Sequence, residues 1–308
     1  MSKRSLIRII ILLVVIDFVA GCWYLASRYE STGEAFPEFW NDDDTTDVEA
    51  ATLVDAAVPD SFEVVENHKY FISTNPAVPG NENTRFTSIK NVYLKLPTSV
   101  NGCDSIGELI GQLMSMAFNG NTDRQSAVQA FLAKPTFNTA ENVAYFVSDK
   151  SPTTLKSYGN VRTNKVYPLL TSQAMLVFQN DVSVFDGTST TKASHFLHYD
   201  RVNQRVYNYY DIIEKESEEK LLEKINAKID WLNQNKNMTM SHATALPLEF
   251  CVKQKGIMFE FPAGVIAAAT SGPIDVFIEK NEVKPLLVSN FAKQYAANTG
   301  WWTYQQPK

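Results

Sequence analysis

The first thirty residues limit the fold of this chain more than any other stretch. Three basic residues, Lys3, Arg4 and Arg8, precede an uninterrupted apolar run from Ile9 to Ile16. The machinery of protein export and membrane insertion recognises this order of basic and then apolar residues. A helix of a soluble domain would instead alternate apolar and polar positions. The sequence therefore predicts that the residues after this run lie outside the cytoplasm.

Two kinds of anchor fit this segment, residues 1–29, and the sequence leaves both open. Cleavage before Cys22, after Val19-Ala20-Gly21, would resemble the processing of a bacterial lipoprotein and would place a lipid on Cys22. Without cleavage, residues 6–26 are long enough to span a bilayer core. Asp17 would then lie near mid-bilayer at a cost of about 2.5–3.5 kcal/mol, which the surrounding apolar residues roughly offset. Both alternatives predict a membrane-attached protein.

Residues 30–60 have little hydrophobic periodicity and contain the acidic run NDDDTTD at 41–47. This composition is typical of a solvated, flexible segment. An EF-hand calcium loop would need a glycine and a distal glutamate that the run lacks. We therefore expect an acidic tether between the membrane and a folded domain.

Regular patterns begin at Ser61. Alternating residues predict paired strands at 61–73 and 84–97, and capping signatures at Ser105 and Thr122 predict two helices. Short strands follow between 143 and 209, then a long amphipathic helix at 214–237, and then strands at 246–253 and 256–262. Because strands and helices cluster in blocks, the predicted class is α+β, with mixed or antiparallel sheets and helices packed on one face. Two subdomains are expected, at 61–140 and 141–308.

The charge of the chain limits the classes of partner that we expect. The net charge is −6, and basic residues do not cluster beyond the N-terminus. Nucleic-acid binding requires clustered Lys and Arg to neutralise phosphates, so no nucleic-acid partner is expected. We expect a monomer. If Cys22 carries a lipid or lies in the membrane, Cys103 and Cys251 remain either as a disulfide pair or as two separate thiols, and both alternatives stay open.

Few residues have the spacing of a reactive centre. His195, His198 and Asp200 form a His/carboxylate cluster, but in a strand His195 points away from the other two, so no metal site is assigned. No nucleophile motif or phosphate loop is present, so no catalytic or cofactor-binding residue is assigned. Trp301 and Trp302 could stack on a sugar, although an aromatic cap on the core is favoured.

Two stretches resemble a known family. Residues 184–225 contain Ala193-Ser194-His195 where the extracytoplasmic C-terminal domain of RsiV anti-sigma factors and PdaC-type deacetylases has Gly-Ala-His. Residues 258–278 resemble the closing motif of that domain, including Gly272, but Gly264-Val265 replaces its Tyr-Glu. The resemblance implies an extracytoplasmic domain without chemistry of its own, which in the anti-sigma factor binds lysozyme.

The sequence and the resemblance together predict a bacterial envelope protein, in the periplasm or attached to the outer membrane. Its expected role is non-catalytic binding or sensing of an envelope or host-derived ligand, such as a lysozyme-like protein or a cell-wall component. The alternative is a cell-wall hydrolase or transferase. The candidate ligand or motif positions are His195, Gly264, Gly272, Trp301 and Trp302.

The predicted location can be tested by chemical labelling. A cysteine introduced between Asp42 and Asp47 should react with a membrane-impermeant maleimide in whole or outer-membrane-permeabilised cells, because the tether should face away from the cytoplasm. A lack of labelling would contradict this topology. Cys22→Ala separates the two anchors, since only a lipoprotein should lose acyl label.

Overall fold

The computed structural model describes residues 60–73, 87–135, 145–150, 159–297 and 302–304. All of them belong to one compact unit that extends from Asp55 to Lys308. The predicted anchor and residues 30–59 of the predicted tether lie outside the described residues. Within the described ranges, no helix has both the length and the apolar content to span a membrane.

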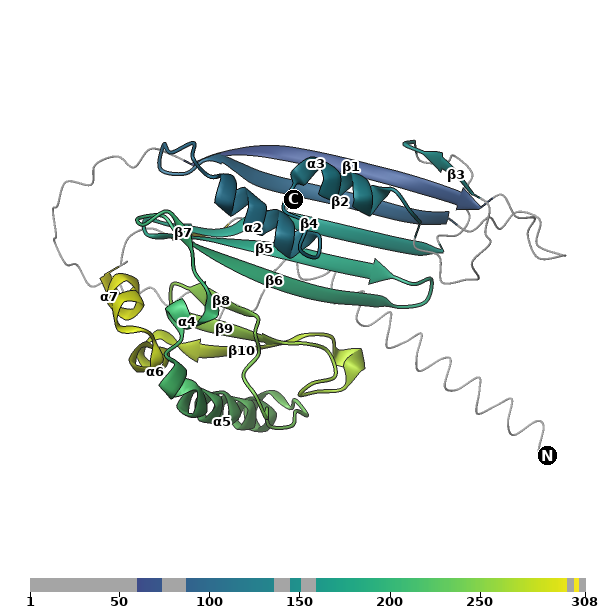
Figure 1. Cartoon of the computed structure of the whole chain (residues 1–308). Helices are drawn as coiled ribbons and strands as arrows, with labels where there is room; N and C mark the ends of the chain where they lie inside the picture. The colour runs from purple at the N-terminus through teal and green to yellow at the C-terminus, as the bar shows by residue number, and fades with distance from the viewer. Residues whose placement is uncertain (1–59, 74–86, 136–144, 151–158, 298–301, 305–308) are drawn as a thin grey trace, which may run out of the picture. The chain divides into compact units, whose positions relative to one another are not determined.

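A large mixed sheet runs the length of the unit (Figure 1). Its strand order is β3-β1-β2-β4-β5-β6-β7, and β11 pairs with β4. All neighbouring pairs are antiparallel except β2 and β4. The strands are β1 (Ser61–Ser73), β2 (Thr87–Ser99), β3 (Tyr145–Ser148), β4 (Asn160–Ser172), β5 (Met175–Phe185), β6 (Thr190–Asp200), β7 (Arg205–Val206) and β11 (Trp302–Tyr304).

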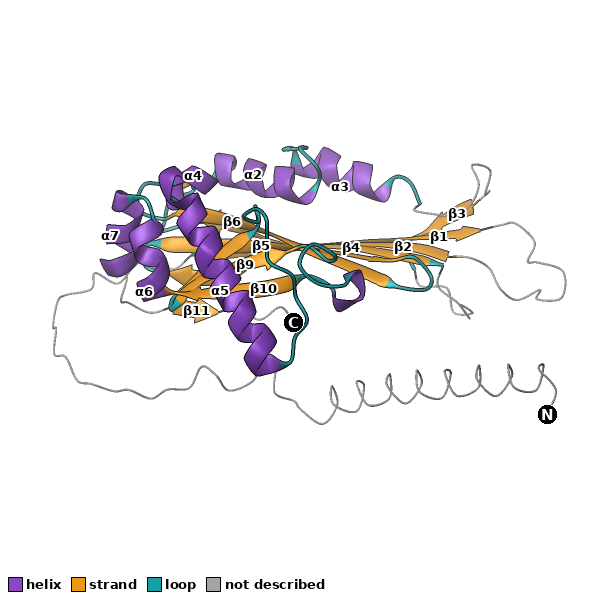
Figure 2. Cartoon of the chain, turned by 90° about the horizontal axis from the view of Figure 1, so that it is seen from below, coloured by secondary structure: helices purple, strands orange, loops and turns teal. Residues whose placement is uncertain are grey.

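Two helices, α2 (Gly107–Ala117) and α3 (Arg124–Leu132), cover one face of this sheet (Figure 2). Leu109 and Leu113 of α2 are buried in the same hydrophobic cluster as Leu94 and Phe178 of the sheet. The capping box predicted at Ser105 does not form, because Ile106 is the N-cap residue and no side chain caps the helix. In α3 the cap is Asp123, whose carboxylate accepts a hydrogen bond from the Ser126 amide at 2.8 Å.

A second layer packs against the other face, at one end of the long strands (Figure 2). It contains a three-stranded antiparallel sheet in the order β10-β9-β8 and the long helix α5, whose Leu221, Ile225 and Ile229 are fully buried. The elements of this layer are α4 (Tyr209–Ile212), α5 (Glu218–Lys236), β8 (Phe250–Lys253), β9 (Gly256–Phe261), β10 (Ile274–Glu279), α6 (Lys280–Val283) and α7 (Ser289–Ala297), with 3₁₀ turns at Lys215–Ser217, Ala269–Ser271 and Lys284–Leu286.

The α+β class predicted from the sequence is confirmed. The large sheet crosses the expected subdomain boundary at residue 140, because β2 and β4 pair in parallel from Ser88–Asn160 to Leu94–Val166. Strands from 61–140 and from 141–308 therefore share one sheet and one hydrophobic cluster.

A buried ion pair ties the start of the domain to the β6–β7 turn. The Nη2 atom of Arg201 donates to Asp60 Oδ1 at 2.7 Å. The side chain of Arg201 is only 1% exposed and that of Asp60 only 5%. The same carboxylate oxygen accepts from the Asn101 amide at 3.1 Å, and Arg201 Nη1 donates to the Ser172 carbonyl at 2.5 Å. Asp60, the last residue of the predicted tether, is therefore part of the folded domain.

Asp60→Ala should lower the free energy of unfolding of the full chain by about 3–5 kcal/mol, because it leaves the Arg201 charge buried without its carboxylate. The matched control is Glu63→Ala, which removes the carboxylate that pairs with Arg124 at the surface and should change stability by about 1 kcal/mol or less. Urea unfolding measures both. Equal losses in the two variants would contradict this role of Asp60.

Candidate functional site

His195 lies where the two sheets meet, along the free edge of β6. This strand pairs with β5 along its whole length but with β7 only at Tyr199 and Asp200. On the edge of β6 that faces away from β5, two carboxylates accept hydrogen bonds from backbone amides. Glu260 Oε1 accepts from the Ser194 amide at 3.2 Å, and Glu249 Oε2 accepts from the Phe196 amide at 3.1 Å. The other oxygen of Glu249 lies 2.7 Å from His195 Nδ1. We call Ser194, His195, Glu249 and Glu260 the edge cluster.

His198 joins the sheets from the buried face of β6. Its ring stacks on Phe250 at a centroid distance of 4.8 Å and an interplanar angle of 15°. Its Nε2 accepts a hydrogen bond from the Val252 amide at 3.2 Å, which requires an unprotonated nitrogen. Burial lowers the pKa of His198 to about 3, so the ring stays neutral. His198 therefore has a structural role in the contact between the two sheets.

The surroundings of Glu260 and His195 raise the pKa of both side chains. Burial, with further contributions from Asp275 and Glu249, raises the pKa of Glu260 to about 7. The hydrogen bond with Glu249 raises the pKa of His195 above its ordinary value. Glu260 can therefore exchange a proton near neutral pH, which is a property of acid–base residues.

Nearby polar groups are already hydrogen-bonded to one another. Ser194 Oγ donates to Asp181 Oδ1 at 3.1 Å, and the Tyr167 hydroxyl donates to Asp181 Oδ2 at 2.8 Å. Neither of the two surface hollows described below is lined by His195 or Glu260. In the described part of the chain, no group of three or more His, Cys, Asp or Glu side chains is placed to hold a metal ion. The arrangement can hold two sheets together and exchange a proton.

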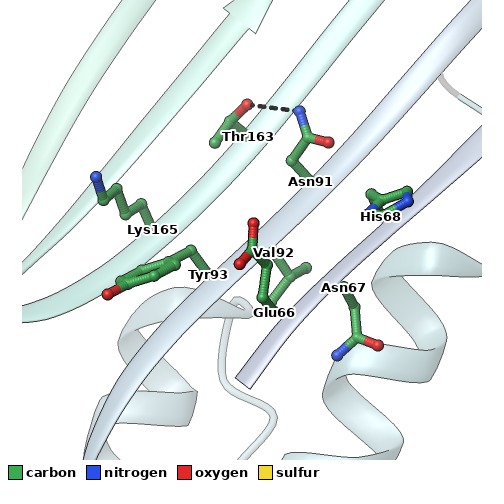
Figure 3. A pocket seen from close by; sticks show the side chains of 8 residues that line it. All are labelled: Glu66, Asn67, His68, Asn91, Val92, Tyr93, Thr163 and Lys165. Carbon is green, nitrogen blue, oxygen red and sulfur yellow. Dashed lines mark hydrogen bonds between the residues drawn. The ribbon is translucent and has the colours of Figure 1, made fainter. Parts of the chain in front are cut away.

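A polar hollow of about 240 Å³ lies on the sheet where β1, β2 and β4 run side by side (Figure 3). Asn91 Nδ2 donates to Thr163 Oγ1 at 3.3 Å, and the Lys165 ammonium lies 5.2 Å from the centre of the Tyr93 ring. Glu66 and His68 contribute a carboxylate and an imidazole from β1. The hollow offers hydrogen-bonding groups beside a similar share of apolar surface.

A second hollow, of about 440 Å³, lies between α4, the first turns of α5 and the segment before β8. Leu222, Leu246 and Leu248 form apolar walls, and Leu248 is 83% exposed. We call it the α4–α5 groove. Its lining residues are Tyr209, Tyr210, Glu218, Glu219, Leu222, Thr244, Ala245, Leu246 and Leu248.

The remaining candidate positions fall elsewhere. Gly264 and Gly272 bound a loop between β9 and β10 and have φ values of 84° and 72°, which suit glycine. Trp302 belongs to β11 and pairs with Ser172, whereas Trp301 lies outside the described residues.

Cys103 and Cys251 do not form a disulfide. Cys103 Sγ lies 3.4 Å from Gln204 Oε1, whereas Cys251 is completely buried in β8, in the core of the second layer. Of the two alternatives that the sequence left open, the structure has the two separate thiols.

Sequence reasoning missed Glu249 and Glu260. Each is a single acid between apolar residues, in Leu248-Glu249-Phe250 and in Phe259-Glu260-Phe261. An ionisable residue inside an apolar strand needs a partner, and this signal could have identified both.

Glu260→Gln should make the stability of the full chain less dependent on pH. The folded pKa of Glu260, about 7, lies above the unfolded value of about 4.3, so the stabilisation from its protonated form is present below the unfolded value and is lost as pH rises to about 7. The glutamine side chain keeps an acceptor for the Ser194 amide without this loss. The variant should therefore unfold at a higher temperature than the native chain at about pH 8 and differ little at about pH 4.5.

The control is Glu223→Gln on the exposed surface of α5, which removes the same charge away from the edge cluster. A Glu260→Gln variant that is less stable than the native chain at about pH 8 would show that Glu260 is bound as a carboxylate.

Comparison with known proteins identifies the fold. No protein-family model matches the sequence, and no protein of curated function matches it significantly. The structure is similar to a member of the duf3298 family from Bacteroides fragilis, with a TM-score of 0.57, 12% identity, and coverage of 77% of this chain and 98% of that chain. It is also similar to a DUF3298 family protein from Pseudomonas aeruginosa, with a TM-score of 0.50, 12% identity, and coverage of 76% and 97%.

At this identity the likeness shows the fold alone. These comparisons do not test the more specific resemblance to the RsiV and PdaC-type domain, which stays a prediction. The described domain thus has the fold of DUF3298 proteins, which are bacterial domains of unknown function.

Proposed function

We propose that this protein is a membrane-anchored, extracytoplasmic binding or sensing module without catalytic activity, whose ligand is an envelope or host-derived molecule. The observation that carries this proposal is the α4–α5 groove. Leu248 is 83% exposed and Tyr210 is 54% exposed on its border. Large apolar side chains exposed together at a concave surface are typical of interaction sites.

The polar groups support the same role. Glu249 and Glu260 hydrogen-bond to amides of β6, and Glu249 also holds His195. A general acid–base pair would need these carboxylates and this imidazole for a substrate, whereas here they contact other groups of the protein. The anchor proposed for residues 1–29 would keep such a module at the membrane surface, and the motif resemblance makes a lysozyme-like protein one candidate ligand.

A cell-wall hydrolase or transferase is the rival function, because the pKa of Glu260, about 7, suits a general acid or base. Purified full chain should therefore be incubated with peptidoglycan, next to Glu260→Gln and His195→Gln variants. We expect no release of soluble fragments by any of the three. Release by the native chain that is lost in Glu260→Gln would contradict the binding role.

The binding role makes a positive prediction. Full chain immobilised through a C-terminal tag should retain a defined protein or wall fragment from envelope extract, and purified lysozyme should be applied separately as a candidate. Glu260→Gln should retain the same ligand, because Glu260 lies outside the α4–α5 groove. Failure to retain any ligand above a tag-only control would count against this function.

A further inference from the structure

We infer that the α4–α5 groove binds a cationic segment of a partner protein, in which apolar side chains alternate with lysine or arginine. This inference rests on the proposed binding function and names the chemistry of the ligand. Two features of the groove carry it: its apolar walls and the carboxylates at its border.

The apolar part of the groove comes from three separate segments. Tyr209 and Tyr210 come from α4, Leu222 comes from the second turn of α5, and Leu246 and Leu248 come from the segment before β8. The Tyr209 ring packs edge-on against Phe250 at 5.5 Å and against Tyr210 at 5.2 Å, so the core holds the base of the groove in place. Leu248, at 83% exposure, is the part of this surface that a partner would cover most.

The border of the groove is acidic. Glu218 and Glu219 line it, and Glu214 and Glu216 lie just before them in the chain. The contact with Glu216 raises the pKa of Glu214. Lys215 is the basic residue between them, and its ammonium lies 5.8 Å from the centre of the Tyr210 ring. Among the described residues, none of the four glutamates forms an ion pair.

The hydroxyl of Tyr209 is inaccessible to solvent and has no hydrogen-bond partner in the described structure. Burial and the nearby Glu218 raise the pKa of Tyr209, so the hydroxyl keeps its proton. Tyr209 therefore adds no charge to the base of the groove, and the charges beside it come from the glutamates of the border.

Charge complementarity selects the occupant. Carboxylates without an ion-pair partner beside an apolar surface favour a ligand that carries both a positive charge and an apolar side chain. A second copy of this chain is a poor match, because its net charge is −6 and this face would meet an equally acidic one. A neutral glycan would leave the carboxylates without a counter-charge. A cationic protein segment matches the walls and the border together.

The test uses full-length protein and a labelled peptide, Lys-Leu-Arg-Trp-Lys-Leu-Arg, with binding measured by fluorescence anisotropy. The same peptide with glutamine at every basic position is the neutral probe. The native chain should bind the cationic probe at least about tenfold more tightly than the neutral one. Its affinity should fall as salt rises from about 50 to 300 mM, because exposed charges are then screened.

Two variants remove the two halves of the site. Leu248→Ser removes the exposed apolar contact, and the double variant E218Q/E219Q removes the border charges. Each should weaken binding of the cationic probe by about tenfold. The matched controls are Val265→Ser, which changes another exposed apolar residue, and Glu223→Gln, which removes a charge of α5 outside the groove. Both controls should bind like the native chain.

Equal binding of both probes, no binding of the cationic probe, or unchanged binding in Leu248→Ser and E218Q/E219Q would overturn the groove assignment. The outcomes that would contradict the proposed function differ from those that would contradict the groove assignment. If a ligand captured from envelope extract binds both groove variants as well as the native chain, the module binds through another surface and only the groove assignment is wrong. If no ligand is captured while the peptide results hold, the groove chemistry stands without the proposed biological role.

Discussion

The way in which the two sheets are joined at β6 determines much of the rest of this structure. Buried backbone amides need hydrogen-bond acceptors. Along the free edge of β6 these acceptors are the carboxylates of Glu249 and Glu260, and on its buried face His198 accepts from the amide of Val252. Side chains, rather than a further ladder of strand pairing, therefore connect the second layer to the large sheet. The edge cluster therefore lies at the seam between the two layers, outside both of the hollows described above.

Local patterns predicted the local structure well. The helix expected at 214–237 is α5 at Glu218–Lys236, preceded by a 3₁₀ turn, because its apolar spacing leaves one buried face. The strands expected at 61–73 and 256–262 match β1 and β9 closely. Pairing was not predictable in the same way. The partners β2 and β4 are separated by α2, α3 and β3, and alternation says nothing about which distant strand is the neighbour. The same reason explains why Asp60 was assigned to the tether, since its partner Arg201 is 141 residues away.

The candidate site was predicted only in part. His195 stood out by composition, and the alternation of a strand predicted that it points away from His198. Its partner Glu249 is 54 residues away in sequence, and no periodicity links the two. The α4–α5 groove is harder still to predict, because it is built from three segments and its apolar residues look like ordinary core positions in the sequence. Leu248 differs from a core leucine only in being exposed, which is a property of the fold rather than of its neighbours in the chain.

The parallel pairing of β2 with β4 has a consequence for how the chain acquires its fold. Residues such as Asn91 and Thr163, which meet across these strands, are 72 positions apart. The β1–β2 hairpin and the β4–β5–β6 meander can each form from near neighbours, but joining them closes a long loop, and such non-local contacts slow folding. Until that step, the edges of β2 and β4 are both open, and unpaired edges promote aggregation. When the chain is synthesised from its N-terminus, the β1–β2 hairpin is complete long before β4 emerges, so the edge of β2 stays open over that interval.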